Sequence, residues 1–288
     1  MEKQKHVDDV SSTDMQSNNL ILKVYDIFLE SSRSLLKFNG EQLDEINIYI
    51  YNDSIRKIFQ FLNTINFFSK NANYEICCNE FNCSIIIIGE FNIQHLEYCN
   101  LTYYQINDNV IIDKKFNDWY GILKNSKTFT QRDDNIRKNI HSLLIKEVPV
   151  NSQIIFIGGE MYVYAKILNY IKGIAFTDYE SIKQITEENN QIPTYLINYD
   201  INIIFPHLLS NDINPNICII NVLDGLSKNL AKQINSLNIN KLIIISCKLK
   251  TLNSDKKLIN MDLYEVYNLK TSCQHIVLSI YTKKILHT

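Results

Sequence analysis

Glycine and proline are scarce in this sequence, which has only 7 glycines and 4 prolines among its 288 residues. Isoleucine, asparagine, lysine and tyrosine are over-used instead, a bias that we attribute to AT-rich coding. Composition is therefore a weak indicator of function for this chain. The sequence has no GxxxxGK phosphate loop, and its Ser, His and Asp residues have no spacing that indicates a hydrolase triad.

Long apolar runs and an excess of one charge are also absent. Runs such as CSIIIIGEF have the length of a core strand rather than of a membrane span, so we expect no membrane association. Charged residues make up 21% of the chain and the formal net charge is −2, which excludes a strongly basic protein that coats nucleic acid. Any contact with RNA would depend on a local patch.

The cysteines form neither a disulfide pattern nor a zinc-ligand pattern. The first 19 residues are polar and lack the apolar run of a secretory signal, so we expect a reducing, intracellular and cytoplasmic setting. Most of the cysteines are then expected to be small buried apolar residues. The seven are Cys77, Cys78, Cys83, Cys99, Cys218, Cys247 and Cys273.

The chain divides into three expected regions. Residues 1–19 are polar and are expected to form a disordered tail. Residues 20–127 mix strands and helices without regular alternation, which predicts a smaller α+β accessory domain. Its expected elements are strands at 46–52, 83–91 and 109–115 and a helix at 53–68.

In residues 128–288 strands and helices alternate regularly, and the expected strands are continuous apolar runs. This alternation is typical of a buried, mostly parallel sheet in a Rossmann-like α/β domain. The last two strands have no helix between them, which predicts an antiparallel hairpin at the sheet edge. We expect helices at 133–148, 161–171, 180–190 and 227–237, and strands at 152–159, 173–178, 194–200, 216–223, 241–247, 263–270 and 275–284.

Ligands of such a sheet bind at the carboxyl ends of its strands, so the residues that follow each strand are the first candidates for a site. Gly158 and Gly159 follow the first strand and precede a helix, where they either admit a ligand or form a plain tight turn. Asp178 and Asp200 follow the next two strands. An acid at such a position binds ribose hydroxyls or simply caps a turn.

Cys247 ends a later strand and is followed by several lysines. Nearby cations would favour its thiolate or contact phosphates, although a packed and inert thiol is an equally simple interpretation. His275 begins the last strand, where a half-buried histidine needs no functional explanation. The lysines are Lys248, Lys250, Lys256 and Lys257.

The order of these segments is more informative than any one of them. FTQRDDN, IIFIGGEMYVYAKIL, IAFTDYESI, ICIINVLDGLS and IIISCKLKTLNSDKKLI follow one another and precede the final hairpin. Over residues 128–284 this order resembles the S-adenosylmethionine-dependent RNA (uracil-5-)-methyltransferases that modify tRNA and rRNA. The longest match keeps Ser246, Cys247, Thr251, Leu252 and Asp255 in register with the family.

The resemblance implies a class I methyltransferase fold and a specific set of roles. Cys247 would attack carbon 6 of a uracil that has left its stack, in tRNA or rRNA, and S-adenosylmethionine would supply the methyl group. Residues assigned to the cofactor would be Gln131, Gly158, Gly159, Asp178 and Asp200.

The sequence also departs from the family pattern at several of its functional positions. Met161 replaces the second glycine of the cofactor loop, residues 221–224 (Asn-Val-Leu-Asp) replace its DPPR, Lys248 replaces an asparagine, and Ile276 falls on the base glutamate. We therefore expect a catalytically degenerate member that binds RNA or a protein partner. An active enzyme in which His275 replaces the base is the second hypothesis, and an unrelated Rossmann-like protein is the third.

Overall fold

The computed structural model describes separate strands before residue 131 and most of the chain after it. The described residues are 22–29, 31, 33–39, 42–45, 72–78, 83–89, 102–106, 111–112, 116–117, 123–124, 131, 133–190, 192–197, 203–222, 225–247, 249–271 and 274–283.

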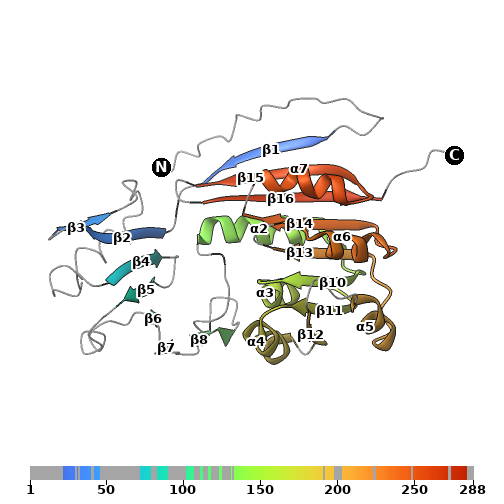
Figure 1. Cartoon of the computed structure of the whole chain (residues 1–288), viewed down its shortest axis with the longest axis horizontal. Helices are drawn as coiled ribbons and strands as arrows, with labels where there is room; N and C mark the ends of the chain where they lie inside the picture. Colours follow the sequence, from blue (N-terminus) through green and yellow to red (C-terminus); the bar gives the residue numbers. More distant parts are fainter. Residues whose placement is uncertain are drawn as a thin grey trace, which may run out of the picture.

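The larger body is built on an eight-stranded sheet (Figure 1). Strand β16 is antiparallel to both of its neighbours, and every other pairing is parallel, which confirms the predicted Rossmann-like fold and its antiparallel closing pair. Across the sheet the strands are β1 (Lys23–Phe28), β15 (Asp262–Lys270), β16 (His275–Thr282), β14 (Lys241–Ser246), β13 (Ile217–Asn221), β10 (Gln153–Gly158), β11 (Lys172–Thr177) and β12 (Thr194–Leu196).

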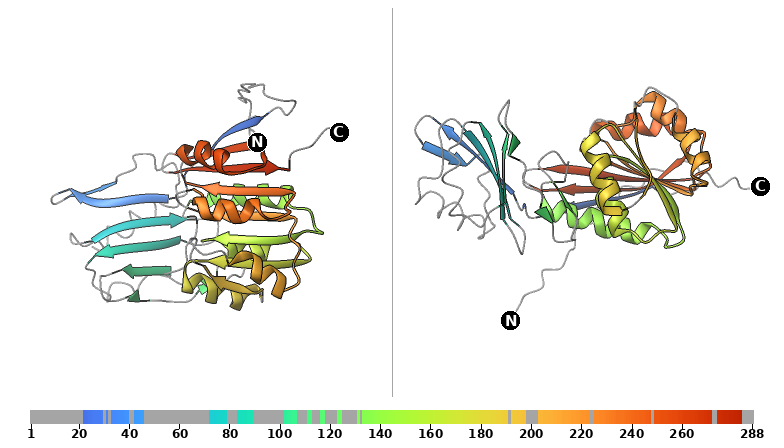
Figure 2. Two further views of the ribbon diagram at one scale, coloured as in Figure 1. Left: turned by 45° about the vertical axis from the view of Figure 1, so that its right-hand side comes forward. Right: turned by 90° about the horizontal axis from the view of Figure 1, so that it is seen from below.

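Helices cover both faces of this sheet (Figure 2). Ile154 and Phe156 of β10 belong to one buried cluster, and Ile155 and Ile157 belong to the other, because successive side chains of a strand point to opposite faces. The first cluster contains α2 (Asp134–Glu147), α3 (Met161–Ile167) and α4 (Glu180–Asn190), and the second contains α5 (Ile204–Ser210), α6 (Lys228–Asn235) and α7 (Leu249–Leu258).

The region before residue 131 contributes a six-stranded sheet and a strand pair. Strand β5 confirms the strand expected at 83–91, whereas the strand expected at 46–52 and the helix expected at 53–68 lie outside the described residues. In sheet order the six strands are β3 (Gln42–Glu45), β2 (Arg33–Asn39), β4 (Ala72–Cys78), β5 (Cys83–Gly89), β6 (Thr102–Ile106) and β7 (Ile111–Ile112), and the pair is β8 (Phe116–Asn117) with β9 (Leu123–Lys124).

Strand β1 was not expected in the larger sheet. It lies outside β15, in parallel register from Lys23↔Glu265 to Phe28↔Lys270, so the larger sheet includes a strand from the predicted accessory region. The closing hairpin was expected at the edge of the sheet, but β1 occupies that edge. Immediately after β1, Leu29 N–H donates to Lys270 O at 2.7 Å. Ser31 Oγ then donates to the carboxylate of Asp133 at 2.8 Å. The same Asp133 caps α2, so one buried acid fixes both segments that connect the two sheets.

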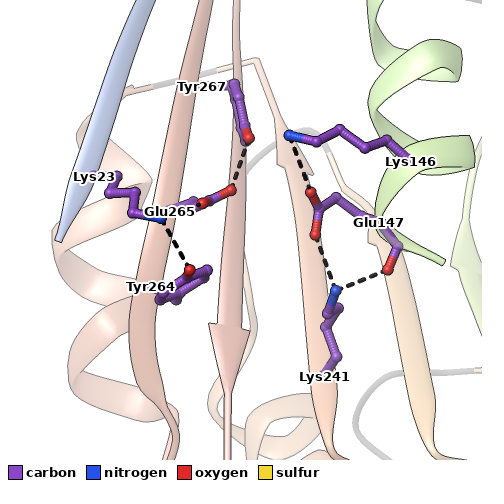
Figure 3. Close-up of polar contacts among 7 residues, drawn as sticks. All are labelled: Lys23, Lys146, Glu147, Lys241, Tyr264, Glu265 and Tyr267. Carbon is purple, nitrogen blue, oxygen red and sulfur yellow. Dashed lines mark hydrogen bonds and ion pairs between the residues drawn. The ribbon is translucent and has the colours of Figure 1, made fainter. Parts of the chain in front are cut away.

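Two groups of polar contacts lie at the amino end of the larger sheet (Figure 3). One joins α2 to β14, and the other joins β1 to β15. Lys241 Nζ donates to the backbone oxygen of Glu147 at 2.8 Å and to its carboxylate at 2.9 Å. Nearby, Tyr267 Oη donates to the buried Glu265 at 2.7 Å. These contacts lie at the end of the sheet opposite to the strand ends that bind ligands in this fold class.

Within the described ranges, no helix is both long enough and apolar enough to cross a membrane. The same residues contain no group of three or more His, Cys, Asp or Glu side chains that could hold a metal ion.

Replacing Lys241 by Met should lower the free energy of unfolding by about 1–2 kcal/mol, because the mostly buried Glu147 carboxylate loses its main cation. The matched control is Lys172→Met. Its partner Asp212 is 98% exposed, so this variant should unfold like the wild type. Urea denaturation measures both, and equal losses in the two variants would contradict this assignment.

Candidate active site

The switch point of the larger sheet lies between β10 and β13. The helix after β10 packs on one face and the helix after β13 packs on the other, and a crevice between such strands is the usual ligand site of this fold class. The two strands end opposite each other at Gly158 and Asn221. Gly158 has φ +110°, and a Cβ atom there would lie 1.9 Å from Asn221 O, so only glycine fits.

Glu160 fills the turn that follows these glycines. Its side chain is fully buried. One carboxylate oxygen accepts the backbone N–H of Gln131 at 2.9 Å. The other accepts Tyr164 Oη at 2.8 Å and Asn221 Nδ2 at 3.4 Å. Asn221 Nδ2 also donates to Tyr164 Oη at 2.8 Å, which closes the network across the switch point.

The surroundings of this carboxylate are shielded from solvent. Burial, followed by the charge of Glu160, raises the pKa of Tyr164 well above its ordinary value. Tyr164 is therefore a neutral donor at any physiological pH. A buried carboxylate is tolerated because donors surround it, and removing it would leave those donors buried without an acceptor. The switch point is held by the protein's own side chains.

Gln131 connects the two halves of the carboxyl edge. Its backbone reaches Glu160 beside β10, while its side-chain oxygen accepts Gln274 Nε2 at 2.7 Å beside β16. Strands β13 and β14 lie between β10 and β16, and β14 leads into Cys247. Of the residues assigned to the cofactor, the structure brings together Gln131, Gly158 and Gly159.

The other predicted cofactor residues are less well connected to this network. Asp178 is exposed at the end of the adjacent strand β11, and partial desolvation raises its pKa above the ordinary value. Asp200 lies outside the described residues. Met161 does not project into the loop, because it begins α3 and is buried in the core. Glu160, rather than Met161, fills the turn.

The two predicted catalytic side chains lie on opposite faces of the sheet. Cys247 is partly buried and packs against the cluster that contains Ile276. The alternation along β16 directs His275 to the other face, where Lys270 and Asp26 influence it electrostatically. Burial, followed by Lys270, lowers the pKa of His275. The structure therefore does not bring Cys247 and His275 together.

The segment that matches the family best has structural contacts of its own. Ser246 Oγ and Thr251 Oγ1 share a hydrogen bond of 2.9 Å, and Asp255 Oδ1 accepts the N–H of Leu226 at 2.9 Å. A Cβ atom on Gly225 would lie 2.8 Å from Thr251 Cβ. These residues hold the β13–α6 loop against α7. Their match to the family in register is therefore explained by a shared fold, without a shared reaction. Leu223, Asp224 and Lys248 lie outside the described residues.

Sequence reasoning missed the role of Glu160 and Tyr164. Their i,i+4 spacing at the start of a helix is a signal that could have suggested a contact between them. Gln274 was missed because its partner Gln131 is distant in the sequence, and no local pattern connects the two.

Comparison with known proteins supports the fold. No family model matches the sequence, and no curated protein matches it. Among solved structures the chain is similar to Pyrococcus abyssi tRNA (uracil-54, C5)-methyltransferase in complex with S-adenosyl-L-homocysteine, with 12% identity and a TM-score of 0.63 over 91% of this chain and 79% of that chain. It is also similar to the M. jannaschii tRNA m1G37 methyltransferase, with 12% identity and a TM-score of 0.49 over 88% and 92% of the two chains.

The larger body therefore has the fold of a class I methyltransferase, and an RNA methyltransferase shares that fold over most of both chains. At this level of identity the similarity extends to the fold alone.

Replacing Glu160 by Ala should lower the free energy of unfolding by about 2–4 kcal/mol, because it leaves the backbone N–H of Gln131 and the hydroxyl of Tyr164 buried without their acceptor. The control Glu187→Ala, at an exposed position of α4, should have little effect. Urea denaturation compares the two. A loss no larger than that of the control would show that the network does not hold the switch point.

Proposed function

We propose that this chain is an RNA-binding protein built on an RNA (uracil-5-)-methyltransferase scaffold, and that it does not transfer methyl groups. The proposed absence of methyl transfer rests on one observation: the turn at the switch point is filled by the buried carboxylate of Glu160. The proposed RNA binding is supported by the similarity to a transfer RNA methyltransferase over 91% of the chain, together with the order of the sequence motifs. The setting that we propose is cytoplasmic.

The residues at the switch point do not fit S-adenosylmethionine. In this fold class the loop after the first strand approaches its ligand through glycine backbone. Here Glu160 follows Gly159, and its carboxylate already takes the donors that face the loop from Gln131, Tyr164 and Asn221. We therefore assign no step of a reaction to this cofactor.

Incubating the purified chain with methyl-labelled S-adenosylmethionine and unmodified transfer RNA should leave the RNA unlabelled. The same RNA should bind the chain in a filter-binding titration, with an affinity that falls as salt rises. Methyl transfer that is lost in Cys247→Ala would refute the non-catalytic proposal. Absence of RNA binding at low salt would refute the RNA-binding proposal.

An active enzyme is the second candidate, and the position of Cys247 favours it. The thiol follows β14 at the carboxyl edge and is only partly buried. RNA that contains 5-fluorouridine would then become covalently attached to Cys247, because a fluorine at carbon 5 cannot leave as a proton does. We expect no such adduct in denaturing gels, and an adduct absent from Cys247→Ala would favour the active enzyme.

A further inference from the structure

Three residues form a line across one edge of the larger sheet, at the carboxyl ends of β1 and β15 and the amino end of the antiparallel β16. Phe28 pairs with Lys270, and Lys270 pairs with His275, so the three side chains are at one level of the sheet and point to one face. Lys270 Nζ lies 2.7 Å from the carboxylate of Asp26, two residues before Phe28, which confirms the shared face. We call Phe28, Lys270 and His275 the carboxyl-edge row.

The aromatic member of the carboxyl-edge row is open to solvent. Phe28 is 77% exposed, although it belongs to a strand of the larger sheet. Lys270 Nζ lies 5.2 Å from the centroid of its ring. A phenyl ring in contact with water is less favourable than a buried one, so a ligand that covers Phe28 is stabilised by burying it.

Two buried polar atoms on β15 and β16, on the face of the carboxyl-edge row, lack partners among the described residues. Within the described part of the chain, Asn268 Oδ1 and His275 Nε2 are buried and have no hydrogen-bond partner. Asn268 is only 7% exposed, and its amide nitrogen donates to Asp26 at 3.1 Å. Buried polar atoms in native proteins are nearly always paired, and an unmet one requires an explanation such as a ligand. Lys270 also has three N–H donors, of which Asp26 takes one in this structure.

We propose that the carboxyl-edge row binds single-stranded RNA, with a base stacked on Phe28 and a phosphate bound by Lys270. This inference rests on the proposed RNA-binding function and gives that function a location. Exposed aromatic rings beside cations are the common device for binding unpaired nucleotides without sequence preference. A protein partner would require a broader apolar core, whereas the residues around Phe28 are an acid, a lysine, an amide and an imidazole.

The row also lies at the edge where the predicted chemistry would take place. Cys247 follows the neighbouring strand β14, and the connections to the six-stranded sheet leave from the same end of β1. A nucleotide stacked on Phe28 would therefore lie at the same edge of the sheet as Cys247, but on the opposite face.

Fluorescence anisotropy with a fluorescein-labelled oligouridylate tests this site in the full chain. Phe28→Ala should bind roughly tenfold more weakly, because one base loses its stacking surface. Phe28→Tyr keeps a ring and should bind like the wild type. The matched control Phe205→Ala removes a 50% exposed ring from α5 and should also bind like the wild type.

A phosphodiester of the same length without bases separates stacking from charge. It should bind wild type and Phe28→Ala equally, since only the phosphate contacts remain. If wild type and Phe28→Ala bind oligouridylate equally well, Phe28 is not part of an RNA site and this inference is overturned. The proposed RNA-binding function still stands in that case if both proteins bind transfer RNA. Failure of the wild type to bind any of these RNAs would overturn the proposed function and this inference with it.

Discussion

The rest of this structure depends on one buried carboxylate at the switch point of the sheet. Glu160 has no solvent exposure, so its charge is stable only while protein donors surround it. Those donors come from three separate places: the segment before α2, the first turn of α3 and the end of β13. One side chain thus links these three places and fixes the segment that enters the methyltransferase-like domain.

Asp133 plays the corresponding role for the connection between the two sheets. It caps α2 and accepts Ser31 Oγ, so both crossing segments meet at one residue. From there Gln131 extends along the carboxyl edge to Gln274. Glu160, Gln131 and Asp133 together order the edge of the sheet at which ligands of this fold class bind, and the carboxyl-edge row lies beyond them on β1, β15 and β16.

Local pattern was sufficient to predict most of the larger body. Strands such as β10 and β14 are buried on both faces and read as continuous apolar runs, and α2 combines a capping Asp with an apolar stripe. Strand β1 could not be predicted there, because its partner β15 is distant in the sequence and parallel pairing leaves no local signal. The candidate site was predicted at the carboxyl ends of the strands, where the structure brings Gln131, Gly158 and Gly159 together, but Glu160 was read as part of a loop. Its role depends on Gln131 and Asn221, which only the fold brings together.

The measurement that tests this account most directly is a calorimetric titration of the wild-type chain with S-adenosylmethionine. If Glu160 blocks cofactor binding at the switch point, the titration should show no saturable heat of binding over the range of concentrations at which active methyltransferases of this fold bind S-adenosylmethionine. A saturable one-to-one binding isotherm would contradict the account, because it would require the crevice between β10 and β13 to open to the cofactor.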